Sequence, residues 1–209
     1  MPLNRVACFV VRRRQESEVL KQDKSKWNER YLEKTGVDSE PDPFLVENSN
    51  LFQGGRALDL ACGLGANSIF LSSRNYWVDS IDISESALRK LQGRSRSLRL
   101  ELGLVVADLD YYPLPQKLYD LILVFYFFSE ALLQPIADAL KPVGALVYCT
   151  YNYLHTSLKP DFKTRYLVPK GGLAPFFREM EVILDEPETG EASNLSRLIA
   201  RKPRPPYNC

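Results

Sequence analysis

The chain has 209 residues, of which 45% are hydrophobic and 25% are charged, and its formal net charge is +1. These values are ordinary for a globular protein that is long enough to bury a substantial core. Domains that coat nucleic acid carry a clear basic excess, so the near-neutral charge argues against a nucleic-acid partner. No apolar run approaches the ~18 residues that a membrane-spanning helix needs, so no membrane segment is expected.

Residues 1–20 fit no regular element and are expected to form an N-terminal extension. Their run of arginines follows the short apolar stretch, which is the wrong order for a secretory signal. A helix is predicted over 25–35, because Trp27 and Tyr31 fall on one helical face. The next segment, 36–55, is rich in loop-forming residues, and the only element expected in it is a short helix at 44–48.

Strands and helices then alternate along the chain. Strands are predicted at 56–62, 77–82, 102–107, 119–126, 144–150, 181–186 and 196–202, and helices near 66–74, 84–95, 129–140 and 171–179. Alternation of this kind indicates parallel βαβ units. The last two strands have no helix between them, so the final strand is expected to run antiparallel near one edge.

The expected fold class is therefore α/β. We expect a single doubly wound, Rossmann-like domain over 21–203, with a seven-stranded, mostly parallel sheet and one antiparallel strand near an edge. Residues 204–209 are expected to form a tail.

A tight turn of small residues follows the first of these strands. The sequence ALDLACGLGANS (57–68) contains a strand, Asp59, the turn around Gly63 and Gly65, and the beginning of a helix. Small residues let the backbone adopt unusual dihedrals and approach a ligand closely. The carboxylate of Asp59 would repel a diphosphate and attract a cationic ligand with an ammonium group.

Two kinds of nucleotide cofactor compete for this turn. The dinucleotide fingerprint G-x-G-x-x-G would place its third glycine at Ser68, which is not a glycine. Asp82, at the end of the next strand, is placed to accept hydrogen bonds from the ribose hydroxyls of a nucleoside. Asp59 and the missing glycine favour S-adenosylmethionine over a nicotinamide cofactor. A turn without any ligand remains the alternative.

Four segments in this order resemble the motifs of class I S-adenosylmethionine-dependent methyltransferases. They are DLACGLGANSIFLSSRNYWVDSIDIS (59–84), VVADLDYYPLP (105–115), YDLILVFYFF (119–128) and LKPVGALVYCTY (140–151). Val143 stands where the family usually has a glycine. The order and spacing of the segments match the family over residues 25–203.

Within this superfamily the sequence is most similar to the small tellurite-resistance-type methyltransferases. The similarity rests on KWNERY (26–31), on DLACGLGxNS, and on YLVPKGGLAPFF (166–177) followed by EVILDEPE. Ala61 departs from the glycine of the wider superfamily but agrees with this group. Members of the group differ in substrate, so the resemblance informs architecture more than acceptor.

The resemblance implies S-adenosylmethionine as the cofactor and a set of residues that contact it. The implied contacts are Asp59, Ala61, Cys62, Gly63, Gly65, Asn67, Asp82, Ile83, Asp108, Leu109 and Val124. A sulfonium cofactor carries an activated methyl group, so the protein has mainly to align donor and acceptor and to exclude water.

The acceptor side offers three weaker candidates. Tyr126 ends the strand that the resemblance places beside the methyl group, but it also fits an ordinary buried aromatic. His155 follows the next strand and has the residue type of a general base, or of a packing residue. Arg165 fits an anion-binding role or a solvated charge. Arg30 and Tyr31 could close the entrance, or could belong to the packing face of their helix.

The predicted function is methyl transfer from S-adenosylmethionine to a small molecule: a thiol, a metalloid oxyanion, a halide, or a small amine or acid. The N/D-P-P-[YF] motif of enzymes that methylate nucleobases and glutamines is absent, and the sequence at that place is VFYF. A binding module without catalysis and a nicotinamide-dependent oxidoreductase are the alternatives. We expect a monomer or homodimer.

The cysteines indicate a reducing, cytoplasmic environment. Cys8, Cys62, Cys149 and Cys209 are scattered, without a C-x-x-C pair, and are expected to be small reduced side chains. One histidine and no paired cysteines cannot supply the usual zinc ligand sets, so no metal site is expected.

Overall fold

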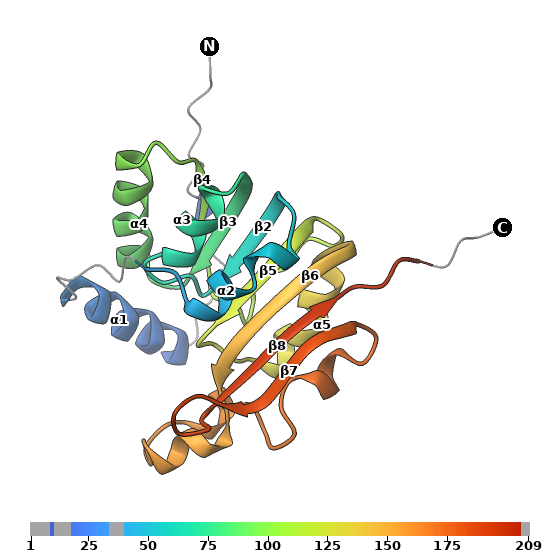
Figure 1. The fold of residues 1–209 in the computed structure, drawn as a ribbon. Helices are drawn as coiled ribbons and strands as arrows, with labels where there is room; N and C mark the ends of the chain where they lie inside the picture. The colour runs from blue at the N-terminus through green and yellow to red at the C-terminus, as the bar shows by residue number, and fades with distance from the viewer. Residues whose placement is uncertain (1–8, 11–17, 34–39, 206–209) are drawn as a thin grey trace. The chain divides into compact units, whose positions relative to one another are not determined.

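The computed structural model describes residues 9–10, 18–33 and 40–205. Its chain divides into two compact units, Met1–Tyr112 and Pro113–Cys209. They are called here the N-terminal unit and the C-terminal unit, and each is described by itself (Figure 1).

The strands of the N-terminal unit are all parallel. They are β1 (Phe9–Val10), β2 (Gly55–Leu60), β3 (Tyr76–Asp82) and β4 (Leu102–Val106), in the spatial order β1-β4-β3-β2. In the register of β2 and β3, Asp59 lies opposite Ser80. In the register of β3 and β4, Asp82 lies opposite Val106. The strand ends that carry the predicted cofactor residues therefore lie at one edge of these strands.

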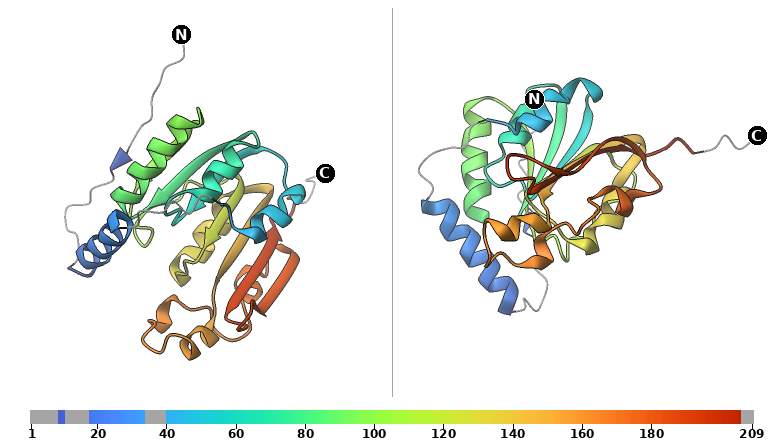
Figure 2. Two further views of the ribbon diagram at one scale, coloured as in Figure 1. Left: turned by 60° about the vertical axis from the view of Figure 1, so that its left-hand side comes forward. Right: turned by 60° about the horizontal axis from the view of Figure 1, so that its bottom comes forward.

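Helices join and flank these strands. They are α1 (Glu18–Glu33), α2 (Pro43–Glu47), α3 (Ala66–Ser72) and α4 (Glu85–Ser97), with a 3₁₀ turn η1 (Ser49–Leu51). The Ser84 hydroxyl caps α4 by accepting from the backbone N–H of Ala87. Leu88 and Leu91 make the buried face of α4, and α1 runs beside α4 in both views of Figure 2.

The C-terminal unit contains β5 (Tyr119–Phe125), α5 (Glu130–Ala139), β6 (Leu140–Tyr151), β7 (Glu181–Thr189) and β8 (Leu195–Arg201). Three 3₁₀ turns, η2 (Tyr153–Ser157), η3 (Thr164–Tyr166) and η4 (Ala174–Phe177), lie between β6 and β7. The strand order is β5-β6-β8-β7, and β8 is antiparallel to both of its neighbours.

The predicted α/β class is confirmed, as are all seven expected strands and the antiparallel orientation of the last one. The described residues contain one strand more, because the two-residue β1 pairs with β4. This strand and the first turns of α1 correct the expectation that 1–20 holds no element, although the rest of that range lies outside the described residues. The helix expected from 25 begins at Glu18.

The helix predicted near 171–179 is wrong, because only the single turn η4 forms there. Gly171 and Gly172 have φ angles of 100° and 77°, which an α-helix does not contain. Pro175 follows them and can donate no backbone hydrogen bond. The apolar spacing of Leu173 and Phe177 was therefore a packing pattern, since both side chains are buried.

Asn152, which directly follows β6, fastens this end of the strand to the hairpin between β7 and β8. Its fully buried amide nitrogen lies 3.2 Å from Pro187 O, 2.8 Å from Ser193 O and 3.0 Å from Leu195 O. Its side-chain oxygen accepts from Leu154 N at 2.9 Å. Buried amides rarely find this many partners by chance, so Asn152 fixes the position of η2 relative to the hairpin.

We expect Asn152→Ala to lower the free energy of unfolding by about 2–4 kcal/mol, because three partly buried carbonyls and one N–H would lose this partner. Urea denaturation measures the change. Asn48→Ala is the matched control, since the Asn48 amide makes one such bond, to Phe44 O, and should cost about 1 kcal/mol. Equal losses in the two variants would contradict the role given to Asn152.

Candidate cofactor site

The turn between β2 and α3 has a tightly folded backbone. Ala61, Gly63 and Gly65 have left-handed φ angles of 54°, 53° and 71°. Gly65 N donates to Cys62 O at 2.9 Å, and Cys62 N donates to Ile81 O at 3.1 Å. The turn is therefore closed on itself and held to the end of β3, and its central residues Gly63 and Gly65 are buried.

Tyr31 of α1 lies against the middle of this turn. A Cβ atom placed on Gly63 would come 2.6 Å from the Tyr31 hydroxyl oxygen. The Tyr31 ring also stacks on Trp27, with 5.9 Å between the ring centroids. Tyr31 therefore packs along its helix and also reaches the glycine turn; that it closes the entrance to a cofactor site stays a prediction.

Two groups of hydrogen bonds hold α1 on α4. Asn28 Oδ1 accepts from the Ser84 hydroxyl at 2.9 Å and from Ser86 N at 3.1 Å. One turn further along α1, Lys90 Nζ donates to Tyr31 O at 2.5 Å. These bonds involve α1 at Asn28 and at Tyr31 itself. The contact with α4 therefore positions the Tyr31 ring over Gly63.

Asp82 connects the turn to the start of α4. Its side chain is 5% exposed. Oδ2 accepts from Gly63 N and Oδ1 from Ser84 N, each at 2.8 Å. Burial raises the pKa of Asp82, and the backbone donors Ser84, Gly63 and Ile83 oppose that shift. The carboxylate thus holds the turn to the start of α4, and its contact with a cofactor stays a prediction.

Asp59 lies beneath the turn, in a chain of buried hydroxyls. The Ser80 hydroxyl donates to the Ser68 hydroxyl at 2.8 Å, and the Ser68 hydroxyl donates to Asp59 Oδ2 at 2.5 Å. Asp59 is 2% exposed. Burial raises its pKa to about 7, the Ser68 bond lowers it, and the charge of Asp82 raises it again. Near neutral pH this carboxyl can be present with or without its proton.

The other predicted cofactor residues of the N-terminal unit surround the same strand ends. Asn67 Oδ1 accepts from Asp42 N at 2.8 Å, which ties α3 to the segment before α2. Asp108 Oδ1 accepts from Asp110 N at 2.9 Å, and burial raises the pKa of this carboxyl. Ile83 is half-buried and Leu109 is buried. Direct contact of these residues with a cofactor stays a prediction.

Cys62, in the same turn, is half-buried and reduced. Burial, with smaller effects from Asp82 and Asp59, raises the pKa of its thiol well above the ordinary value. The thiol therefore stays protonated and is a small packing group, not a nucleophile. Within the described residues no group of three His, Cys, Asp or Glu side chains is placed to hold a metal ion.

The remaining predicted residues belong to the C-terminal unit. Val124 is fully buried in β5, and Tyr126, directly after β5, is 52% exposed. His155 is buried in η2. The Arg165 guanidinium lies at the surface over the ring of its neighbour Tyr166, at 4.6 Å. Their part in catalysis stays a prediction.

The sequence interpretation missed the residues that support the turn. Ser68 was treated only as a missing glycine, although its hydroxyl bonds Asp59. Asn28 and Lys90 were not considered, because their partners lie more than 50 positions away along the chain. Ser84 could have been found, since a serine before a helical stretch is a common N-cap.

The geometry described above fits an adenosyl cofactor: a tight glycine turn after a strand, with a carboxylate at the end of the adjacent strand. Residues 57–144 match a family model described as a methyltransferase domain. The matched segment is less than half of the chain, and over these residues the chain is similar to a methyltransferase domain. The class predicted from the sequence is confirmed, and S-adenosylmethionine is the cofactor of this class.

The curated relatives match part of the chain. An uncharacterised protein of Mycobacterium tuberculosis and one of Mycobacterium bovis are each 33% identical to it over 81 residues. These residues are 39% of this chain and 30% of each relative. The match therefore spans less than a third of the length of these relatives.

Solved structures share the fold. TehB from Haemophilus influenzae has a TM-score of 0.68 at 17% identity, over 84% of this chain and 67% of that one. The N-methyltransferase NodS from Bradyrhizobium japonicum, in complex with S-adenosyl-L-homocysteine, has a TM-score of 0.63 at 14% identity, over 85% and 99%. These identities establish the fold, and the likeness to the tellurite-resistance-type group stays a prediction.

We expect Gly63→Val to abolish binding of S-adenosylhomocysteine in calorimetric titration. The branched side chain would collide with the Tyr31 hydroxyl and strain a left-handed residue, at a cost of about 1–3 kcal/mol in stability. Gly93→Ala, at an exposed helical position where a Cβ meets nothing within 4 Å, is the control and should bind normally. A folded Gly63→Val protein with unchanged affinity would remove the turn from the site.

The raised pKa of Asp59 predicts a pH dependence of stability. The folded state prefers the protonated carboxyl, so the free energy of unfolding should fall as pH rises from about 4 to about 7 and stay level above that. The full effect is on the order of 4 kcal/mol. Asp59→Asn should flatten this part of the profile in urea denaturation.

Asp161→Asn is the control for this profile, because Asp161 is exposed and its replacement should leave the slope as it is. If the free energy of unfolding changes between pH 4 and pH 7 by the same amount in the wild type and in Asp59→Asn, then Asp59 ionises normally and the prediction is wrong.

Proposed function

We propose that this protein transfers a methyl group from S-adenosylmethionine to a small-molecule acceptor, with the cofactor held by the N-terminal unit. The observation that carries the proposal is the Asp82 carboxylate, which accepts from Gly63 N and Ser84 N at the end of β3. When bound, the cofactor supplies an activated methyl group on a sulfonium. The chain's own residues bind the cofactor, orient the acceptor and exclude water.

Asp82 has capacity left for a ligand. Its two oxygens offer about four lone-pair sites. The hydrogen bonds from Gly63 N and Ser84 N use one site on each oxygen, and Ile83 N is a third, weaker backbone donor. The remaining sites fit the two hydroxyls of a ribose, and the hydrogen bonds would be charge-assisted. The bonds to Gly63 and Ser84 also fix the orientation of the carboxylate before the ligand arrives, which lowers the cost of binding.

Asp59 supports a cationic ligand from below the turn. A carboxyl with a pKa of about 7 gains charge when a cation binds nearby, because an opposite charge favours the ionised form. This response fits a cofactor that carries a sulfonium and an ammonium group. Ser68 holds the carboxylate oxygen in place, which explains why the third glycine of a dinucleotide fingerprint is replaced here.

The proposed acceptor is a small molecule, as the sequence predicted, and the protein is proposed to act as a monomer or homodimer in the cytoplasm. Cys62 and Cys149 are both free thiols, which is compatible with a reducing compartment. Among the described residues, no helix is both long enough and apolar enough to cross a bilayer.

Calorimetric titration tests the cofactor. S-adenosylhomocysteine should bind the wild-type protein, and NADH should not. Asp82→Asn should weaken binding roughly 10- to 150-fold, corresponding to the ~1.5–3 kcal/mol of a hydrogen bond to a charged group. An amide cannot accept from Gly63 N and Ser84 N at once, so loss of turn geometry adds to the effect.

Asp79→Asn is the matched control, because Asp79 lies three residues earlier on β3 and forms an ion pair with Arg56 at 2.8 Å. This variant should bind S-adenosylhomocysteine like the wild type. If NADH binds and S-adenosylhomocysteine does not, the protein belongs with the nicotinamide-dependent enzymes and the proposal fails. If both Asp variants bind equally well, Asp82 is not part of the site.

A further inference from the structure

Four rings gather at one end of the C-terminal unit. Tyr151 lies between the other three: its centroid is 3.9 Å from that of His155, 5.5 Å from Tyr126 and 5.8 Å from Phe162. Phe162 also meets His155 edge to face at 4.9 Å. We call these four residues the Tyr151 cluster. Tyr126 is exposed, Tyr151 and Phe162 are half-buried, and only His155 is buried.

The cluster lies where α/β proteins bind their ligands. Tyr126 directly follows β5 and Tyr151 is the last residue of β6, which is parallel to β5. Ligands of open α/β sheets bind beyond the carboxyl ends of such strands. The position is therefore suited to an acceptor, on an observation independent of the cofactor turn.

The backbone holds the Tyr126 ring at the surface. Tyr126 has a left-handed φ of 55°, which is strained for a bulky residue. Its N–H donates to Cys149 O at 2.8 Å, which ties the strained residue to β6. Strain of this kind tends to persist at functional sites. Here the strained backbone directs a large aromatic ring toward the solvent, whereas such a ring is usually buried in the core.

His155 presents a hydrogen-bond donor and not a base. Asn194 Nδ2 lies 2.9 Å from His155 Nδ1, and an amide nitrogen only donates, so Nδ1 accepts and the ring proton is on Nε2. The backbone of Asn194 is held at this place, because its backbone carbonyl accepts from Asn152 N at 3.0 Å. Burial and then the charge of Lys159 lower the pKa of His155, which keeps the ring neutral.

The Nε2 atom of this imidazole is buried and has no hydrogen-bond partner among the described residues. Buried donors nearly always have a partner, and an unsatisfied one destabilises the folded protein. A ligand oxygen would supply the missing acceptor. The imidazole is 4% exposed, so a ligand would have to reach it by displacing part of a neighbouring ring.

The surrounding charge selects among acceptor classes. Lys159 acts on His155 as a positive neighbour, and an N–H donor also disfavours a cation. An ammonium group is therefore a poor match, in spite of the aromatic faces that cations often use. A halide or oxyanion alone would use the N–H donor but not the exposed aromatic ring of Tyr126. A flat ring with an anionic or neutral oxygen satisfies both features.

We propose that the Tyr151 cluster binds a planar aromatic acceptor by its ring, and that an oxygen substituent of this acceptor accepts a hydrogen bond from His155 Nε2. This inference rests on the proposed function and narrows its substrate class to aromatic acids and phenols. Aromatic side chains hold such rings in offset-stacked or edge-to-face arrangements.

The chain's single histidine makes the proposal measurable by NMR. Tag-free protein labelled with ¹⁵N-histidine gives signals from one imidazole, and their shifts report which nitrogen carries the proton. We expect a neutral ring at pH 7 with the proton on Nε2. A proton on Nδ1 would overturn the assigned role of His155.

The same sample is then saturated with S-adenosylhomocysteine and titrated with benzoate, salicylate, 4-hydroxybenzoate and catechol. At least one of these probes should shift the Nε2 signal, whereas cyclohexanecarboxylate and benzylamine should not. The first comparison compound lacks the aromatic ring, and the second replaces the oxygen substituent by a cation. Equal binding of cyclohexanecarboxylate would overturn the aromatic requirement.

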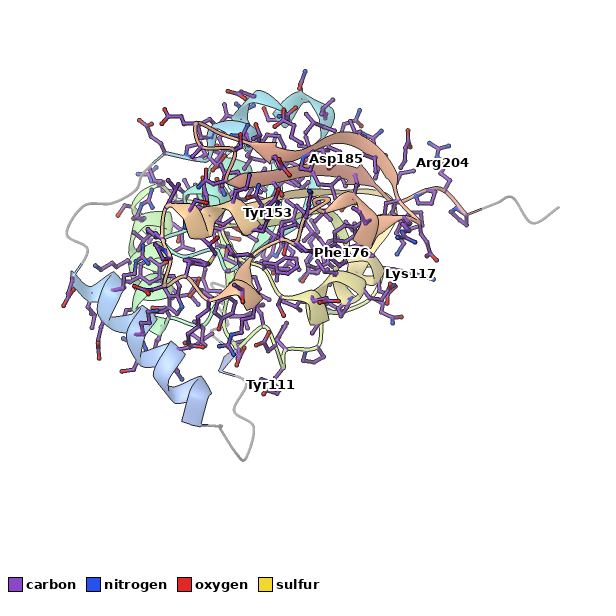
Figure 3. The ribbon with its side chains drawn as sticks, turned by 90° about the horizontal axis from the view of Figure 1, so that it is seen from below. Tyr111, Lys117, Tyr153, Phe176, Asp185 and Arg204 are labelled. Atoms are coloured by element: carbon purple, nitrogen blue, oxygen red, sulfur yellow. The ribbon has the colours of Figure 1, made fainter. Side chains whose placement is uncertain are left out.

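Variants separate a binding role from a structural one. Tyr151→Leu and Tyr126→Leu should each weaken the aromatic probe at least tenfold by saturation-transfer NMR. Tyr126 is at the surface, so its variant remains informative if Tyr151→Leu does not fold. Phe176→Leu is the control, because Phe176 lies on η4 (Figure 3) and pairs with Phe128 outside the cluster. The affinity of this variant for the aromatic probe should stay within twofold of the wild type.

The cofactor measurement keeps the two proposals apart. If S-adenosylhomocysteine binds and no aromatic probe shifts His155 at millimolar concentration, the aromatic site is wrong and the methyltransferase proposal stands. If S-adenosylhomocysteine does not bind, the proposed function fails independently of the aromatic result. Methylation of a non-aromatic acceptor at a rate unaffected by Tyr126→Leu would also overturn the inference.

Discussion

The N-terminal unit depends on one carboxylate that receives two backbone N–H groups from different elements. Asp82 joins the turn after β2 to the start of α4, through Gly63 and Ser84. The turn contains left-handed residues and has few internal bonds, so it would be a poor fixed element by itself. Anchored to β3, it becomes a rigid surface, which is what pre-organised binding requires. The serine that Asp82 bonds also caps α4 and contacts Asn28 of α1.

This arrangement concentrates unfavourable charge in a small buried space. Asp59 and Asp82 are both almost fully buried, and burial raises the pKa of each. A unit selected only for stability would have apolar side chains here, because buried carboxylates are costly. Perturbed carboxyls beside an open turn are typical of functional sites. The hydroxyls of Ser68 and Ser80 offset part of the cost by satisfying Asp59 from within the core.

In the C-terminal unit, hydrogen bonds between neighbouring strands and the hairpin hold aromatic residues at the strand ends. Asn152 fastens the end of β6 to the hairpin between β7 and β8, and the same hairpin supplies Asn194 to the ring of His155. The antiparallel strand β8 makes this possible, because its direction brings the hairpin back to the carboxyl end of β6. Tyr126 is fixed to β6 through its own N–H. The strained backbone of Tyr126 is thus held in place by a neighbouring strand.

The sequence by itself determined the strands, the class of fold and the turn with its two aspartates. Each of these depends on neighbours along the chain: apolar runs of strand length, small residues where the backbone turns, and a carboxylate directly after a strand. The resemblance to methyltransferases came from the same local segments, and the family model matches much of the same region.

Only the tertiary structure decided which side chains meet. Ser68 changed from a missing glycine to a donor to Asp59, because β2, α3 and β3 bring three residues far apart in sequence together. The tautomer of His155 depends on Asn194, 39 positions away. The helix expected near 171–179 failed because two glycines with positive φ bend the chain there, and periodicity of apolar residues does not reveal such dihedrals. Burial, charge and hydrogen-bond partners are properties of the packed chain, and so the raised pKa of Asp59 and the donor role proposed for His155 follow from the fold alone.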